Sequence, residues 1–181
     1  MLTIVVPASE VYNELTNEFS YTNETTIRLE HSLVSISKWE AKWKVPFLGQ
    51  GQKTREQIYD YVKFMTISQN VPEDVFRCLT KENYEAIGKY IEDSMTATWF
   101  SDTSNKGPGR EIITSERIYY WMVAYNIPFE CQKWHLNRLL TLIKICSIEN
   151  SKDSNKMSKS AIMRQNSALN KARRSKHKSK G

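Results

Sequence analysis

The chain opens with short segments that alternate in polarity. Leu2–Val6 is apolar and rich in β-branched residues, and Pro7 ends it because proline supplies no N–H to a β-ladder. Polar and apolar residues alternate over Glu18–Tyr21 and again over Thr25–His31. The residues between them, Thr22-Asn23-Glu24, are typical of a turn, which predicts a hairpin. We therefore expect a small antiparallel sheet at the N-terminus.

Helical periodicity replaces this alternation after His31. His31–Ser37 still alternates in part like a strand, but Leu33, Ile36 and Trp43 recur at helical intervals. The proline at position 46 stops a helix before it. The pattern favours a helix from about Ser32 to Lys44.

Three more helices are predicted by signals at their N-termini. Thr54 and Gln57 match a capping box, in which each side chain satisfies a free backbone N–H of the other. Pro72 is followed by two acids, which are favoured at the positive end of a helix dipole, and Thr80 is a further candidate cap. Each signal precedes an apolar stripe: Ile58, Tyr61, Val62 and Met65; Val75, Phe76 and Leu79; Tyr84, Ile87 and Ile91.

The second half of the chain predicts two strands and then helices. Thr96–Phe100 and Glu111–Thr114 resemble strands, and they flank the Gly- and Pro-containing loop Ser101–Arg110, as in a wide hairpin. Ser115 begins a helix, and Pro128 separates it from a longer one. The apolar positions of these helices are Ile118, Met122 and Tyr125, followed by Leu136, Leu139, Leu140, Ile143 and Cys146.

The predicted fold class is α+β and mostly helical, with a small N-terminal antiparallel sheet. Residues 1–150 form the expected globular domain. The composition of residues 150–155 (NSKDSN) predicts a linker. Within residues 151–181, a basic helix is expected from Ser158 to about Arg174.

The charge is concentrated at the C-terminus. Residues 151–181 hold ten of the 26 lysines and arginines and one of the 20 acids, which leaves the first 150 residues slightly acidic, with 16 bases and 19 acids. Such a segment suits phosphate contacts, yet it has no aromatic residue for stacking bases. It also has no bulky face for inserting into a membrane surface. Its narrow apolar face is compatible with a groove on a partner protein.

Candidate chemistry is sparse. No phosphate-binding loop, zinc-protease or nucleophile-elbow motif occurs, and the three histidines are scattered. Cys131 and His135 would share a helix face, but two ligands do not close a zinc site. The odd number of cysteines favours free thiols in a cytoplasm. We expect no enzyme activity, and therefore no catalytic, metal-binding or cofactor-binding residues and no cofactor.

The candidate residues for partner binding lie in two places. Tryptophan is common in binding hot spots and in cores, and Trp99 and Phe100 stand beside the predicted loop. On the terminal helix, apolar and basic residues are candidates for contact with a protein. These are Ile162, Met163, Leu169, Arg173 and Arg174.

Several longer runs resemble one family of tailed-bacteriophage proteins. The runs are EHSLVSISKWEAKWKVPFLG (30–49), KTREQIYDYVKFMTISQNV (53–71), MTATWFSD (95–102), residues 116–150 and residues 156–176. They are similar to tail assembly chaperones, which are encoded near the tape measure protein. The resemblance implies a non-enzymatic protein that binds the tape measure protein, and other tail proteins with it, before the tail tube polymerises. It implies the host cytoplasm as the location during assembly.

Two other functions remain open from the sequence. A structural or connector protein would stay in the virion, and a nucleic-acid-binding accessory protein would act through the basic C-terminus. Self-association is also left open, whereas a membrane partner is not expected.

Overall fold

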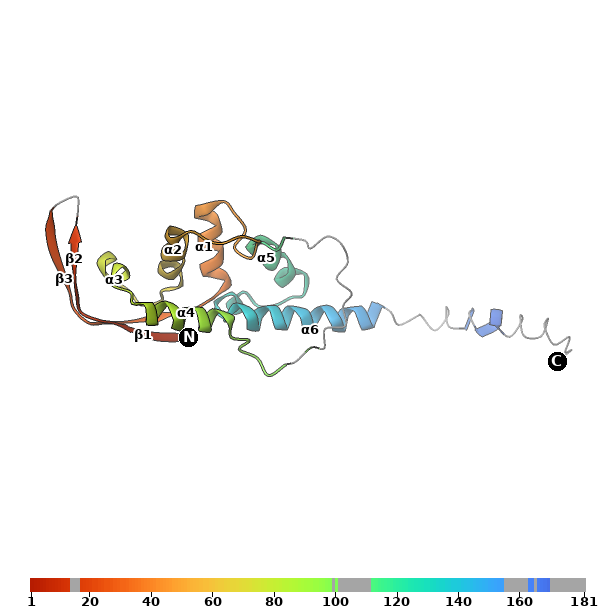
Figure 1. Ribbon diagram of the computed structural model, residues 1–181. Helices are drawn as coiled ribbons and strands as arrows, with labels where there is room; N and C mark the ends of the chain where they lie inside the picture. Colours follow the sequence, from red (N-terminus) through yellow and green to blue (C-terminus); the bar gives the residue numbers. More distant parts are fainter. Residues whose placement is uncertain (14–16, 99, 101–111, 155–162, 165, 170–181) are drawn as a thin grey trace, which may run out of the picture. The chain divides into compact units, whose positions relative to one another are not determined.

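The computed structural model shows an α+β protein with four N-terminal strands followed by helices (Figure 1). It describes residues 1–13, 17–98, 100, 112–154, 163–164 and 166–169. The chain divides into two units, Met1–Ile143 and Lys144–Gly181, and each is described by itself. The elements are β1 (Leu2–Val6), β2 (Ser9–Asn13), β3 (Glu18–Thr22), β4 (Thr25–Leu29), α1 (Leu33–Trp43), α2 (Arg55–Met65), α3 (Glu73–Arg77), α4 (Lys81–Glu92), α5 (Ser115–Ala124), the 3₁₀ helix η1 (Phe129–Lys133) and α6 (Leu136–Ser154).

The strands pair differently from the prediction. β1 pairs with β4 and β2 with β3, all antiparallel, so the predicted hairpin between β3 and β4 is wrong. Val6 pairs with Thr25 and Ser9 with Thr22, so the two ladders keep one register across a short unpaired gap. Pro7 lies in this gap, and its missing N–H interrupts the ladder. Asn23 and Glu24 therefore connect β3 to β4 across this gap, and the chain does not reverse direction there.

The helix starts agree with the predicted caps. Ser32, Thr54 and Thr80 are the N-caps of α1, α2 and α4, and each accepts a hydrogen bond from a backbone N–H three residues on. α5 begins at Ser115, as predicted, and the threonine before it is the N-cap. Such caps satisfy N–H groups that the helix leaves free, which explains why the sequence located these starts well.

The predicted strands around residues 101–111 are wrong where the structure describes them. Thr96–Thr98, Phe100 and Ile112–Thr114 belong to no strand. Instead, the Met95 N–H bonds Oδ1 of Asp93 and the Thr98 N–H bonds Oγ1 of Thr96. Local side-chain acceptors of this kind compete with a ladder for the backbone donors.

The predicted linker is helical where the structure describes it. Residues 150–154 form the end of α6, so the predicted domain boundary after Asn150 lies inside a helix. Polar residues continue a helix readily when no glycine or proline stops it. Of the predicted basic helix, the described positions 163–164 and 166–169 are helical, and the rest lies outside the described residues.

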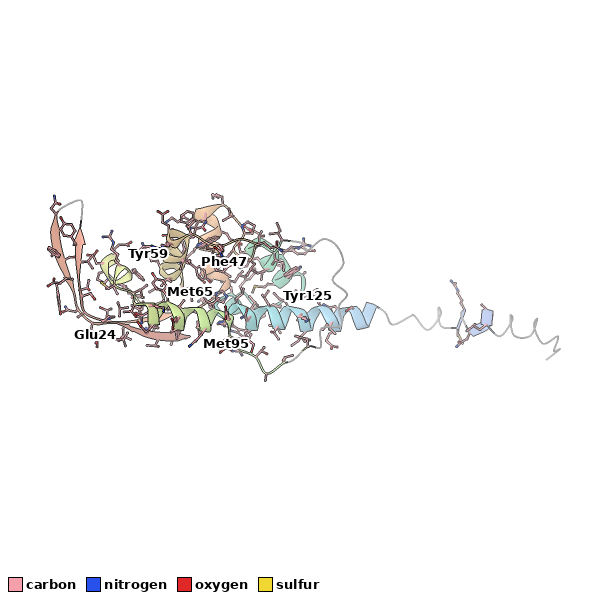
Figure 2. All side chains as sticks on the ribbon, in the orientation of Figure 1. Glu24, Phe47, Tyr59, Met65, Met95 and Tyr125 are labelled. Atoms are coloured by element: carbon pink, nitrogen blue, oxygen red, sulfur yellow. The ribbon has the colours of Figure 1, made fainter. Side chains whose placement is uncertain are left out.

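The core of Met1–Ile143 is centred on α1. Leu33, Ile36 and Trp39 are buried on one face of this helix, which packs against α2, α5 and η1. Phe47 and Met65, which Figure 2 labels, are both buried. The main apolar partners from the other elements are Ile27, Leu29, Val62, Ile118, Met122, Leu136 and Leu139.

One buried carboxylate connects three parts of this core. Oε1 of Glu40 accepts a hydrogen bond from the Phe47 N–H and Oε2 accepts one from the Ser115 N–H, each at 2.8 Å. Glu40 therefore joins α1 to the segment that follows it and to the first turn of α5. Sequence patterns gave no sign of this role.

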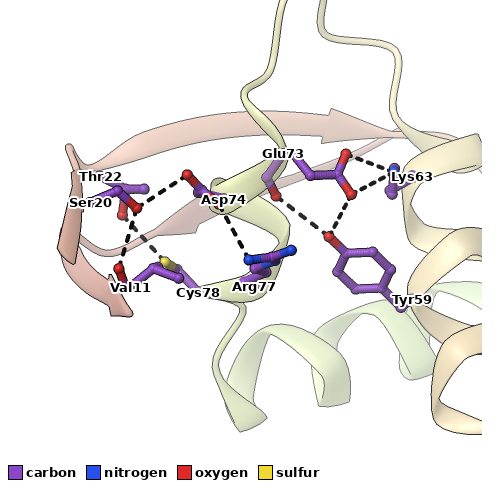
Figure 3. A network of polar contacts seen from close by, with 9 residues as sticks. All are labelled: Val11, Ser20, Thr22, Tyr59, Lys63, Glu73, Asp74, Arg77 and Cys78. Atoms are coloured by element: carbon purple, nitrogen blue, oxygen red, sulfur yellow. Dashed lines mark hydrogen bonds and ion pairs between the residues drawn. The ribbon is translucent and has the colours of Figure 1, made fainter. Parts of the chain in front are cut away.

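A polar network attaches the β2–β3 ribbon to the helices (Figure 3). Ser20 donates to Asp74 of α3, and Thr22 contacts Cys78 just after it. On the other side of α3, Glu73 accepts from Lys63 and from the Tyr59 hydroxyl. These contacts hold α3 between the ribbon and α2.

We expect Glu73→Gln to lower the free energy of unfolding by about 0.5 kcal/mol, as for an exposed ion pair. The Lys63 ammonium lowers the pKa of Glu73, so this contribution is present at neutral pH and is lost as acid protonates the carboxylate. Urea unfolding of both forms at pH 7 and at a pH well below the ordinary pKa of 4.5 measures it. An equal difference at both pH values would contradict the assignment.

Candidate functional site

An apolar groove lies between α2 and α4 in Met1–Ile143. Its volume is about 660 Å³. Phe47, Tyr61 and Ile87 are buried in its floor, whereas Ile58 and Tyr84 are 41% and 36% exposed. The complete lining is Phe47, Lys53, Arg55, Ile58, Tyr61, Val62, Tyr84, Ile87, Gly88 and Ile91.

Gly88 of α4 is part of the groove lining. A Cβ placed on Gly88 would have no heavy atom within 4 Å. Glycine in a helix interior costs about 1 kcal/mol relative to alanine, because it loses more backbone freedom on folding. This glycine therefore keeps space at the groove at the expense of helix stability.

Gly88→Ala is expected to raise the free energy of unfolding by about 0.5–1 kcal/mol, because it adds helix propensity without a clash. Urea unfolding of both proteins measures the difference. A loss of stability would show that a methyl group has no room there.

Two cations lie along the groove. Lys53 Nζ is 4.3 Å from the ring centroid of Phe47 and 5.7 Å from that of Trp39. Burial lowers the pKa of Lys53, since a desolvated ammonium is less stable. Neither Lys53 nor Arg55 forms an ion pair within the described part of the chain, whereas Lys42 pairs with Asp60.

A second hollow of about 460 Å³ shares Arg55 and Tyr84 with the groove. It is lined mainly by polar side chains, together with Trp43. The indole Nε1 of Trp43 is buried and has no hydrogen-bond acceptor among the residues described. The two hollows therefore meet at Arg55 and Tyr84.

A buried cluster of histidine and tyrosine lies behind the groove floor. The rings of His31 and His135 are 5.1 Å apart, Nδ1 of His31 bonds the Tyr61 hydroxyl, and Nε2 of His135 is 2.9 Å from the Tyr90 carbonyl oxygen. The backbone brings them together, since the Leu136 N–H donates to the His31 carbonyl at 2.7 Å. The sequence patterns did not predict that His31 and His135 would lie side by side.

This cluster is arranged for packing more than for proton transfer. Burial, together with His135, lowers the pKa of His31 to about 3, and burial raises the pKa of Tyr61. An acid–base catalyst works best with a pKa near the operating pH. His31 and Tyr61 are both uncharged at neutral pH and act as a hydrogen-bonded part of the core.

Other classes of site find little support in the residues that the structure describes. No group of three or more His, Cys, Asp or Glu side chains there is placed to hold a metal ion. Cys131 and His135 are both buried, but they lie on η1 and before α6, so the expectation of a shared helix face is wrong. No described helix is long and apolar enough to span a bilayer.

Of the residues predicted to bind a partner, the structure describes Phe100, Met163 and Leu169. Phe100 is half-buried and is not part of its lining. In Lys144–Gly181, Met163 and Leu169 are 76% and 49% exposed. Trp99, Ile162, Arg173 and Arg174 lie outside the described residues.

Sequence reasoning missed the groove because its residues also fit core stripes. Ile58, Tyr61 and Val62 were assigned to one helix face, and Tyr84, Ile87 and Ile91 to another. Both assignments describe real helix faces, but the two faces do not close on each other. The available signal was Gly88, a glycine within an otherwise regular helical stripe.

Comparisons with known proteins give no further information on function. No family model, curated protein or solved structure matches the chain. The function must therefore be argued from the groove and from the resemblance in the sequence.

Proposed function

We propose that this protein is a non-enzymatic phage tail assembly chaperone. It holds an apolar segment of the tape measure protein in the α2–α4 groove before the tail tube polymerises. The observation that carries this proposal is the groove itself, an apolar surface with a preformed floor and open rim. The resemblance to tail assembly chaperones supplies the identity of the partner.

The groove has the physical properties that a holding protein needs. Buried side chains fix its floor, so little conformational freedom is lost when a segment binds. Burial of apolar surface contributes about 25 cal/mol for each Å² removed from water. The proposal requires moderate affinity, so that the tube subunits displace the protein later.

Co-expression with the neighbouring tape measure gene tests the proposal. We expect the tape measure protein to become soluble and to co-purify with this chain. Gly88→Trp should abolish the complex by filling the groove, whereas Gly88→Ala should preserve it. An insoluble tape measure protein with no complex would overturn the proposal.

Mass spectrometry of purified particles separates this function from a role in the virion. A chaperone is present in the infected-cell lysate and absent from particles. A stoichiometric copy number in particles would instead identify a structural protein.

A further inference from the structure

We propose that the segment held in the α2–α4 groove is an amphipathic helix with a carboxylate side chain that contacts Lys53 and Arg55. This inference rests on the proposed function and names the chemistry of the partner segment. It follows from the charge and the space that the groove offers.

The two basic side chains of the groove form no ion pair among the described residues. Lys53 is half-buried beside the rings of Phe47 and Trp39, and Arg55 lies on the same lining. By contrast, Lys63 of α2 pairs with Glu73, and Lys81 of α4 pairs with Glu85. A partly desolvated cation gains most from an anion that arrives in the same low-dielectric surroundings.

The space fits one face of a helix. A volume of about 660 Å³ lies within the range of sites that enclose a drug-sized group, which corresponds to several side chains. An amphipathic helix presents such side chains at i, i+3, i+4 and i+7. Gly88 leaves room for one of them beside Ile87 and Ile91.

The chain's own C-terminal segment has the wrong charge for this site. Residues 151–181 carry ten bases and one acid, so they would bring positive charge towards Lys53 and Arg55. Nucleic acid offers anions, but its backbone has no apolar face for the floor formed by Phe47, Tyr61 and Ile87. An acidic amphipathic helix satisfies both features.

The experiment uses the full-length protein and fluorescein-labelled, overlapping 25-residue peptides that cover the neighbouring tape measure protein. Fluorescence anisotropy identifies the peptides that bind. We expect these to be amphipathic and to contain Asp or Glu. Replacing that acid with its amide should weaken binding about tenfold.

Variants of the protein locate the contact. The double variant Lys53→Gln, Arg55→Gln should bind the acidic peptide about tenfold more weakly. Its affinity for the amide peptide should fall by less than twofold. Lys89→Gln is the matched control, because Lys89 is an exposed base of α4 outside the groove lining. It should leave both affinities unchanged. Lys53→Glu should restore binding to a peptide whose acid is replaced by lysine.

The outcomes separate the two proposals. If peptides bind and Gly88→Trp abolishes binding, but the acid has no effect, the acidic helix is wrong and the groove function stands. If no tape measure peptide binds and no complex forms on co-expression, the proposed function fails. If a single-stranded oligonucleotide displaces the peptide and its binding requires Lys53, the groove serves nucleic acid and the inference is overturned.

Discussion

Glu40→Ala is expected to lower the free energy of unfolding by about 3 kcal/mol, because it leaves two buried N–H groups without an acceptor. The carboxylate accepts from Phe47 and Ser115 at 2.8 Å each, and these donors belong to different parts of the core. Alanine also removes side-chain volume from a buried position. Urea unfolding followed by circular dichroism measures the loss.

Two control variants sharpen this result. Glu40→Gln keeps the shape and one acceptor oxygen, so it should cost less than Glu40→Ala. Glu56→Ala removes an exposed acid of α2 and should change stability by less than about 0.5 kcal/mol. A loss below about 1 kcal/mol for Glu40→Ala would contradict the bridging role of this carboxylate.

Acid is expected to unfold the protein through His31. Burial lowers its pKa in the folded state to about 3 from an ordinary value of 6.5. Between these values the unfolded chain binds a proton at His31 that the folded chain does not, so stability falls as the pH falls. The slope from one such group is about 1.4 kcal/mol for each pH unit.

His31→Gln tests this source of acid sensitivity. Glutamine still offers a hydrogen-bond acceptor to Tyr61 but does not titrate. The free energy of unfolding is measured from pH 7 to pH 4. It should decline less steeply in the variant, by about 1.4 kcal/mol for each pH unit. Equal slopes in the two proteins would show that His31 is not the buried neutral group described here.

The helices were predictable because their signals are local. Thr54 and Gln57 meet within one turn, and the same is true of Thr80 and Asn83. Strand pairing is not local in this way. The segments that form β3 and β4 were recognised, but their partners, β1 and β2, precede them, and only Pro7 hinted at the interruption.

The site was less predictable for a related reason. An apolar stripe shows that a helix has a buried face, but it does not show whether another element covers that face. The faces of α2 and α4 that carry Ile58 and Tyr84 remain partly exposed in the groove. His31 and His135 likewise meet only because the backbone bonds Leu136 to His31 across the chain.

Photo-crosslinking tests the central claim, that the α2–α4 groove holds the tape measure protein. A benzophenone amino acid replaces Tyr84 on the groove rim or Tyr120, an exposed residue of α5 outside the lining. After co-expression with the tape measure gene and irradiation, the account predicts a crosslinked tape measure protein from position 84 and none from position 120. A soluble complex that crosslinks at position 120 and not at position 84 would contradict it.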